Sequence, residues 1–188
     1  MRNDQGKKKK DKIIKANSKR EADMKPRVLI IMGSDSDLPV MEEAAKVFRG
    51  FSIPFTMTVA SAHRTPERTL RLVRNAEKSG IEVIIAGAGM AAHLPGVIAS
   101  HTIIPVIGVP IDASPFGGMD ALLSMVQMPP GIPVATVAVG KAGAKNAGLL
   151  AAQIMARNNP ALAKKILDYR KEMAMELEEK AAKIERRN

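Results

Sequence analysis

His63 and His93 are the side chains best suited to proton transfer, and each lies in a segment that interrupts a regular pattern. The ordinary pKa of histidine, about 6.5, lets it gain and lose a proton at neutral pH. Arg64 follows His63 directly, and a guanidinium binds phosphate or carboxylate through paired hydrogen bonds. Taken alone, a histidine in a loop is more often a surface residue than a catalytic one. His101, outside any such segment, is expected on the surface.

The polar segment Gly33-Ser-Asp-Ser-Asp37 lies between a short apolar run and a helical pattern. Free backbone N–H groups at a helix start favour an anion such as phosphate, and the hydroxyls of Ser34 and Ser36 add donors. Asp37 is the predicted N-cap, but helix capping alone explains only one of the four polar residues, so we favour ligand binding. The segment lacks the Lys-Ser/Thr ending of a nucleoside triphosphate loop and the GxGxxG pattern of dinucleotide binding. The residues alone predict a phosphorylated small molecule near two histidines.

Two further kinds of segment are expected to shape this site. The range 87–93 is rich in glycine, and Gly87 and Gly89 let the backbone approach a ligand closely. The ranges 110–118 and 127–133 contain several prolines. Because proline fixes the chain, we expect them to form walls of the site.

The elements that must position these residues are predicted from apolar patterning. Short apolar runs predict five buried strands, at 27–32, 54–60, 83–86, 105–109 and 134–138. Helical spacing between and after them predicts helices at 40–48, 66–78, 93–100, 119–128 and 142–156. This alternation predicts a parallel, doubly wound α/β sheet, which binds ligands outside the carboxyl ends of its strands.

The charge is concentrated at the N-terminus. The chain has 188 residues and a net charge of +10, and residues 1–26 hold ten Lys and Arg against four Asp and Glu. We expect a basic, disordered extension there. A nucleic-acid-binding arm is the alternative, but no aromatic residue is interleaved for base stacking.

The composition excludes several classes of protein. The absence of cysteine excludes a disulfide framework, a thiolate nucleophile and cysteine-ligated metals. No apolar run approaches the ~20 residues that span a bilayer. We expect a soluble, cytoplasmic protein with no membrane partner. The core must be built from aliphatic residues and methionine, because the chain has only four Phe and one Tyr.

The range 158–188 is predicted to contain a long amphipathic helix. Its apolar stripe consists of Leu162, Ile166, Tyr169, Met173, Leu177 and Ile184. The stripe can fold back on its own domain or pack on another subunit. We favour the second arrangement and a homo-oligomer.

Several segments, in this order, resemble the 5-(carboxyamino)imidazole ribonucleotide mutase family over residues 27–157. They are Gly33-Ser-Asp-Ser-Asp37, Ser61-Ala-His-Arg-Thr-Pro66, the range 86–96, and the range 124–129 with 131–136. The resemblance implies a three-layer, flavodoxin-like α/β/α fold and an octamer with sites near subunit contacts. It implies no metal, ATP or organic cofactor. The implied reaction moves a carboxyl group from an exocyclic nitrogen to ring carbon 4 of a ribonucleotide in purine biosynthesis.

The resemblance also implies roles for individual residues. His63 would be the general acid/base, Ser34 and Arg64 would bind the phosphate, and Asp37 the ribose. The range 87–93 would cover the carboxylate and carbon dioxide. The expected substrate-binding set is Ser34, Ser36, Asp37, Ser61, Arg64, Gly87, Ala88, Gly89, Met90, His93 and Leu94. Met90 departs from the family pattern, which commonly has glycine there.

Two alternatives remain from the sequence. A related carboxylase adds free carbon dioxide to aminoimidazole ribonucleotide and makes the same product, although the segments around His63 and His93 resemble the mutase branch. A non-catalytic protein that binds nucleotides or nucleic acid is the other alternative, suggested by the basic N-terminus.

Overall fold

The computed structural model of the chain describes residues 25–186, and a single five-stranded parallel sheet lies at its centre. The strand order is β2-β1-β3-β4-β5. The strands are β1 (Val28–Met32), β2 (Phe55–Val59), β3 (Val83–Gly89), β4 (Val106–Ile111) and β5 (Ala135–Thr136). The predicted doubly wound, flavodoxin-like sheet is therefore confirmed. The predicted basic extension lies almost wholly outside the described residues.

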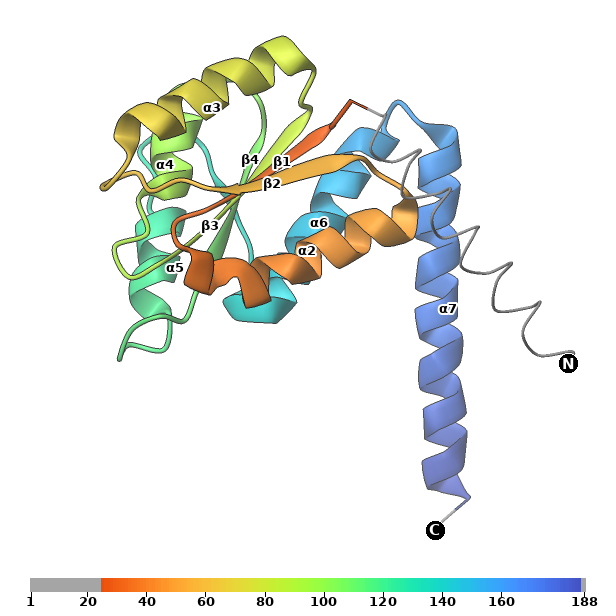
Figure 1. Cartoon of the computed structure of the whole chain (residues 1–188). Coiled ribbons are helices and arrows are strands. Elements are labelled where there is room, and N and C mark those ends of the chain that lie inside the picture. The colour runs from red at the N-terminus through yellow and green to blue at the C-terminus, as the bar shows by residue number, and fades with distance from the viewer. Residues whose placement is uncertain (1–24, 187–188) are drawn as a thin grey trace, which may run out of the picture.

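Helices cover both faces of the sheet, which gives a three-layer α/β/α arrangement (Figure 1). They are η1 (Asp35–Asp37), α2 (Leu38–Phe51), α3 (Pro66–Ser79), α4 (Leu94–Ala99), α5 (Met119–Val126), α6 (Gly140–Ala156) and α7 (Pro160–Glu185). Helices α3, α4 and α5 lie on one face, and α2 and α6 lie on the other with α7 beyond them. Within residues 25–186, no helix combines the length and apolar character needed to cross a bilayer.

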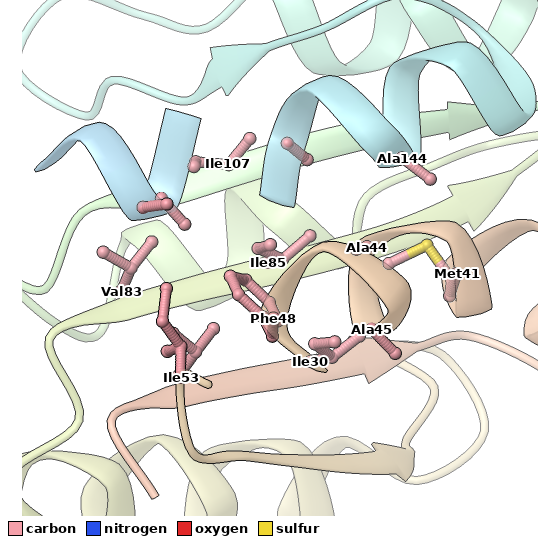
Figure 2. Close-up of a cluster of buried hydrophobic side chains, with 14 of the residues drawn as sticks. Ile30, Met41, Ala44, Ala45, Phe48, Ile53, Val83, Ile85, Ile107 and Ala144 are labelled. Carbon is pink, nitrogen blue, oxygen red and sulfur yellow. The ribbon is translucent and has the colours of Figure 1, made fainter. Parts of the chain in front are cut away.

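The central strands have apolar side chains on both faces, because successive residues of a strand point to opposite sides. In β1, Val28, Ile30 and Met32 face α2 and α6, whereas Leu29 and Ile31 join the core under α3 and α4. Figure 2 shows the first of these cores, in which the fully buried ring of Phe48 packs between α2 and the sheet. Continuous burial on both faces explains why β1 reads as an unbroken apolar run.

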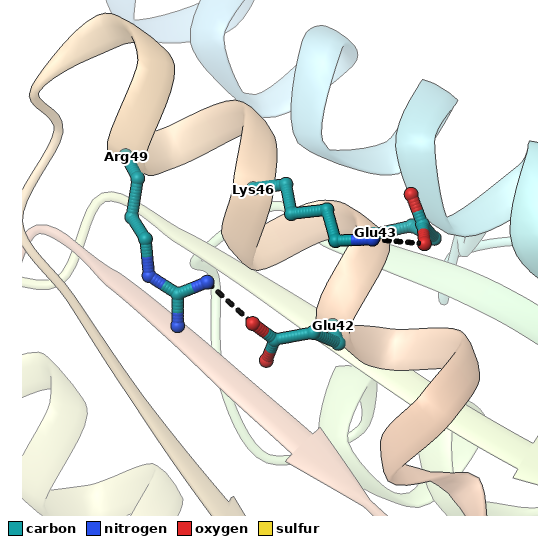
Figure 3. Close-up of polar contacts among 4 residues, drawn as sticks. All are labelled: Glu42, Glu43, Lys46 and Arg49. Atoms are coloured by element: carbon teal, nitrogen blue, oxygen red, sulfur yellow. Dashed lines mark hydrogen bonds and ion pairs between the residues drawn. The ribbon is translucent and has the colours of Figure 1, made fainter.

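Helix α2 carries charged side chains outside its buried apolar face. Ion pairs join Glu42 to Arg49 and Glu43 to Lys46, the second at 2.7 Å (Figure 3). Exposed pairs of this kind add little to stability. The orientation of α2 is set instead by its apolar face, which packs against the sheet and α6.

Helix boundaries follow local signals in most places. Proline in the first turn of α3 and left-handed Gly80 at its end match the predicted start and stop. The predicted cap at Asp37 is wrong in detail, because its side chain makes no cap bond to α2. Ser34 caps the short helix η1 instead, and the Asp37 carboxylate turns back to the Ser34 backbone N–H in a capping box.

Two strand boundaries differ from the prediction. Strand β3 continues through Gly89, so the first residues of the predicted glycine-rich loop belong to a strand. Their pairing with β4 reaches Gly89 and Ile111. Strand β5 is shorter than predicted, because only Ala135 and Thr136 pair with β4 at the sheet edge.

Helix α7 packs on its own domain only near its start. Leu162 and Ile166 are buried, and Tyr169 meets Phe51 edge to face with ring centroids 5.8 Å apart. The helix then runs beyond the rest of the described chain (Figure 1). Apolar side chains along this part are 50% to 67% exposed: Met173, Met175, Leu177 and Ile184.

Candidate active site

The predicted loops meet at the carboxyl ends of the central strands. The order of the sheet reverses between β1 and β3, and doubly wound sheets form their ligand crevice at this point. A cavity of about 560 Å³ lies there. It is lined by Gly33, Ser34, Ser36, Asp37, Ser61, Ala62, His63, Arg64, Ala88, Gly89, Met90, Ala91, His93, Leu94 and Ala113.

Two histidines from different loops touch inside this cavity. His63 Nε2 and His93 Nδ1 are 2.8 Å apart, and the two rings stand nearly perpendicular at 82°. His63 follows β2 and His93 precedes α4, so the contact joins segments 30 residues apart. A hydrogen bond between two imidazole nitrogens needs one donor and one acceptor, so the rings cannot both be fully protonated while it exists. The pair can therefore hold and pass a proton.

The segment after β1 places hydroxyls and a carboxylate on the opposite wall. The Ser36 hydroxyl donates to Ser34 Oγ at 2.9 Å, and the backbone N–H of Ser34 donates to Asp37 Oδ2 at 3.0 Å. Arg64 reaches the same segment from the β2 side, where its Nη2 donates to the Gly33 carbonyl oxygen at 2.9 Å. Hydroxyls, a helix start and a guanidinium thus lie within one cavity and form a set of donors suited to an anion.

Asp37 is the buried acid of the site, at 5% exposure. Burial raises the pKa of its carboxyl, because the charged form loses water. The N–H groups of Ser34 and Gly33 and the charge of Arg64 oppose this shift but do not cancel it. The side chain is a strong acceptor aimed at backbone donors, which suits it to bind hydroxyl groups of a ligand as well.

Local hydrogen bonds hold the loop that carries His63. Thr65 Oγ1 accepts the Ser61 backbone N–H at 2.9 Å, and Ser61 Oγ accepts the Arg64 N–H at 3.1 Å. These bonds close the loop directly before α3. Ser61 and Thr65 therefore fix the backbone on both sides of His63, and its ring is presented to the cavity from a defined position.

The third segment contributes backbone from the end of β3. Gly89 leaves no room for a side chain, because an added Cβ would lie 2.6 Å from the Ala113 Cβ. Gly87 does not line the cavity, since its missing side chain would point at Met41 Sδ. Its carbonyl oxygen instead accepts the Gly33 N–H at 3.1 Å and joins the segments after β1 and β3.

Apart from Gly87, all the expected substrate-binding residues line the cavity. The cavity also has lining residues that the sequence did not single out. Gly33, Ala62, Ala91 and Ala113 also line the cavity. Small side chains carry no chemical signal, and only their places beside the predicted loops could have suggested them. The expected wall at 127–133 is wrong, because Gly131 to Pro133 line a separate cavity with His101. His101 is exposed, as predicted.

The chemistry open to the site is acid–base catalysis on a bound anion. Within residues 25–186, no three His, Asp or Glu side chains gather as a metal site would require. Fold and site together define a flavodoxin-like α/β protein with a histidine pair in a polar crevice. The family model of AIR carboxylase matches residues 27–176. The chain therefore belongs to the AIR carboxylase family.

Curated relatives and a solved structure agree with this assignment. N5-carboxyaminoimidazole ribonucleotide mutase of Pyrococcus horikoshii is 58% identical over 161 residues, which is 86% of this chain and 90% of the relative. The protein of the same name from Escherichia coli K12 is 52% identical over 145 residues, or 77% and 86% of the two chains. The crystal structure of Treponema denticola PurE is similar at a TM-score of 0.77 with 30% identity, covering 84% of this chain and 98% of that one.

Proposed function

We propose that this chain is a mutase that converts N5-carboxyaminoimidazole ribonucleotide into 4-carboxy-5-aminoimidazole ribonucleotide. The observation that carries the proposal is the contact between His63 and His93, beside anion-binding groups in one crevice. Relatives that bear the mutase name are 58% and 52% identical over most of this chain. The reaction is an isomerisation, so it needs no net supply of electrons or atoms.

The substrate is bound by its phosphate and ribose. The phosphate lies against Ser34, Ser36 and Arg64, whose donors converge on the start of η1. The ribose hydroxyls donate to Asp37, which is buried and keeps an acceptor directed into the site. The imidazole ring then extends toward His63 and the end of β3. Binding at both ends fixes the ring before reaction.

His63 acts as the acid and then as the base. The bond between the exocyclic nitrogen and the carboxylate breaks, carbon dioxide leaves, and the nitrogen takes a proton from His63. Ring carbon 4 then attacks the carbon dioxide and forms the new carbon–carbon bond. His63 removes the proton from that carbon and returns to its starting state, so the proton count balances.

His93 positions His63 and controls its proton. In their 2.8 Å contact, one of the two nitrogens, His63 Nε2 or His93 Nδ1, carries the proton and donates it, and the other accepts. His93 thus keeps the His63 ring oriented before substrate arrives. Backbone N–H groups after Gly89 face the carboxylate and stabilise its charge during the transfer.

We also propose a domain organisation and assembly. Residues 27–157 form the catalytic domain, and the exposed part of α7 packs on a neighbouring subunit of a homo-oligomer, an octamer. The support is the row of apolar side chains on α7, exposed by 50% to 67%, which a single copy leaves in water. The basic range 1–26 takes no part in catalysis.

The direct experiment supplies each candidate substrate to purified protein without ATP. We expect conversion of the carboxyamino ribonucleotide, followed by the absorbance of the 4-carboxy product. Aminoimidazole ribonucleotide with bicarbonate is the matched substrate pair for the related carboxylase reaction. A faster reaction with that pair than with the carboxyamino ribonucleotide would overturn the mutase assignment.

A further inference from the structure

Met90 lines the cavity and is exposed, in a backbone conformation that disfavours its side chain. Its φ is +57°, in the left-handed region, where a Cβ crowds the following carbonyl oxygen. Among the described residues other than glycine, only Ser52 shares a positive φ, and Ser52 ends helix α2. Costly conformations of this kind persist where the surrounding structure holds them, and they cluster at functional sites.

The neighbours of Met90 fix this conformation. Before it, the backbone of Gly89 lies so close to β4 that an added Cβ would be 3.1 Å from the Ile111 carbonyl oxygen. After it, the His93 N–H donates to the Ala91 carbonyl oxygen at 2.8 Å, and the His93 ring contacts His63. The backbone is therefore held on both sides of Met90, whose side chain is 58% exposed.

That side chain is apolar, flexible and placed at the opening. Among the described residues that line the cavity, Met90 and Leu94 carry the large apolar side chains. Leu94 is 3% exposed and belongs to the core, whereas Met90 is 58% exposed. Methionine has three rotatable side-chain bonds and adapts to irregular surfaces. It can therefore fold over a bound ligand without a change in the backbone.

We propose that Met90 is a side-chain cover that retains carbon dioxide between the two halves of the transfer. The inference rests on the proposed function, in which carbon dioxide is free for part of the cycle. Carbon dioxide is small and uncharged, so the serines and Arg64 hold it weakly. Closing the mouth with an apolar group excludes water and keeps the molecule beside the ring carbon. Met90 touches no reacting bond and is a positioning residue.

The test follows the fate of the carboxyl carbon. Substrate labelled with ¹³C in the transferred carboxyl reacts in unlabelled bicarbonate with carbonic anhydrase present, and mass spectrometry measures label in the product. Met90→Gly is expected to raise the unlabelled fraction roughly fivefold, the factor for about 1 kcal/mol of lost apolar contact. Met90→Gln, equal in length but polar, should also lose label, and Met90→Leu should keep it.

The outcomes separate this inference from the function on which it rests. Equal label retention in wild type, Met90→Gly and Met90→Gln, with normal product formation, would overturn the role of Met90 alone. No product from the carboxyamino ribonucleotide in the wild type would overturn the proposed function and this inference with it. Thermal melting checks folding, and if Met90→Gly does not fold, Met90→Gln and Met90→Leu decide the question by the same label measurement.

Discussion

The surroundings of Asp37 shift the pKa of its carboxyl in opposite directions. Its carboxylate accepts the Ser34 N–H and lies near Arg64, both of which favour the charged form, yet burial outweighs them and raises its pKa. The folded chain therefore holds the Asp37 proton more tightly than the unfolded chain does. A charge kept buried at a cost to stability is typical of a site that uses it.

The pH dependence of stability follows from this sign. Because the folded pKa of Asp37 is raised, its contribution to stability is complete below the unfolded pKa and is lost as pH rises through the folded pKa. Asp37→Asn removes this titration. Wild type should therefore lose stability relative to Asp37→Asn as the pH rises above the ordinary aspartate pKa of about 4. Urea unfolding of both proteins across this range measures the difference, and a constant difference would contradict the pKa direction.

At the scale of elements, close backbone approach fixes the start of α6 against Ala138. Gly143 lies in the first turn of α6, and an added Cβ would be 1.5 Å from the Ala138 carbonyl oxygen. Gly50, in the last turn of α2, has nothing within 4 Å of such a Cβ. Substitution by alanine is therefore expected to lower stability at Gly143 and to raise it at Gly50.

Gly143→Ala should destabilise the chain by about 3 kcal/mol, because the backbone must move to admit the methyl group. Gly50→Ala is the matched control and should stabilise by about 0.5 kcal/mol, since alanine favours an exposed helix. Denaturant unfolding of the two variants measures both values. If Gly143→Ala proved as stable as wild type, the contact between the start of α6 and Ala138 would not be as close as described.

The sequence predicts the order of elements better than their ends. Apolar runs and helical spacing are local properties, and they predicted all five strands and the parallel sheet. The end of β3 depends instead on pairing between Gly89 and Ile111, which the amino acid types do not reveal. The short β5 lies at an edge, where pairing is decided by packing rather than by its apolar run.

Residues with reactive or charged side chains could be placed in the candidate site from the sequence, whereas lining residues without such side chains could not. His63, Arg64 and the serines have side chains that indicate a role, and the fold brings them to one cavity. Ala113 lines the same cavity through position alone. The contact between His63 and His93 could not be predicted from spacing, because it depends on how two loops fold at the edge of the sheet.

At the scale of the whole molecule, the exposed part of α7 carries apolar side chains that the candidate site does not use. A Leu side chain contributes about 1.5–3 kcal/mol when fully buried. Leu177→Lys should therefore weaken the proposed oligomer and lower its mass in sedimentation experiments. Glu178→Lys, the neighbouring polar position, introduces the same residue as a control. An unchanged mass for Leu177→Lys, or equal losses in both variants, would contradict packing through this stripe.

The basic N-terminal range offers a second test at this scale. Deletion of residues 1–23 leaves Met24 as the first residue and should not change turnover, because the site is built from residues 33 to 113. Any affinity of the full chain for DNA or RNA should fall steeply with salt and should be lost on deletion. Steady-state kinetics of both proteins measure turnover. A loss of turnover in the shortened chain would place the extension in the site.

The central claim is that His63 moves the proton in the carboxyl transfer. The most direct measurement is single-turnover conversion of the carboxyamino ribonucleotide by His63→Asn, with substrate binding measured separately by calorimetry. Binding should be kept, and conversion should fall by roughly 10²–10⁴-fold. His101→Asn, which changes an exposed histidine outside the cavity, should convert at the wild-type rate. Wild-type conversion by His63→Asn would contradict the account.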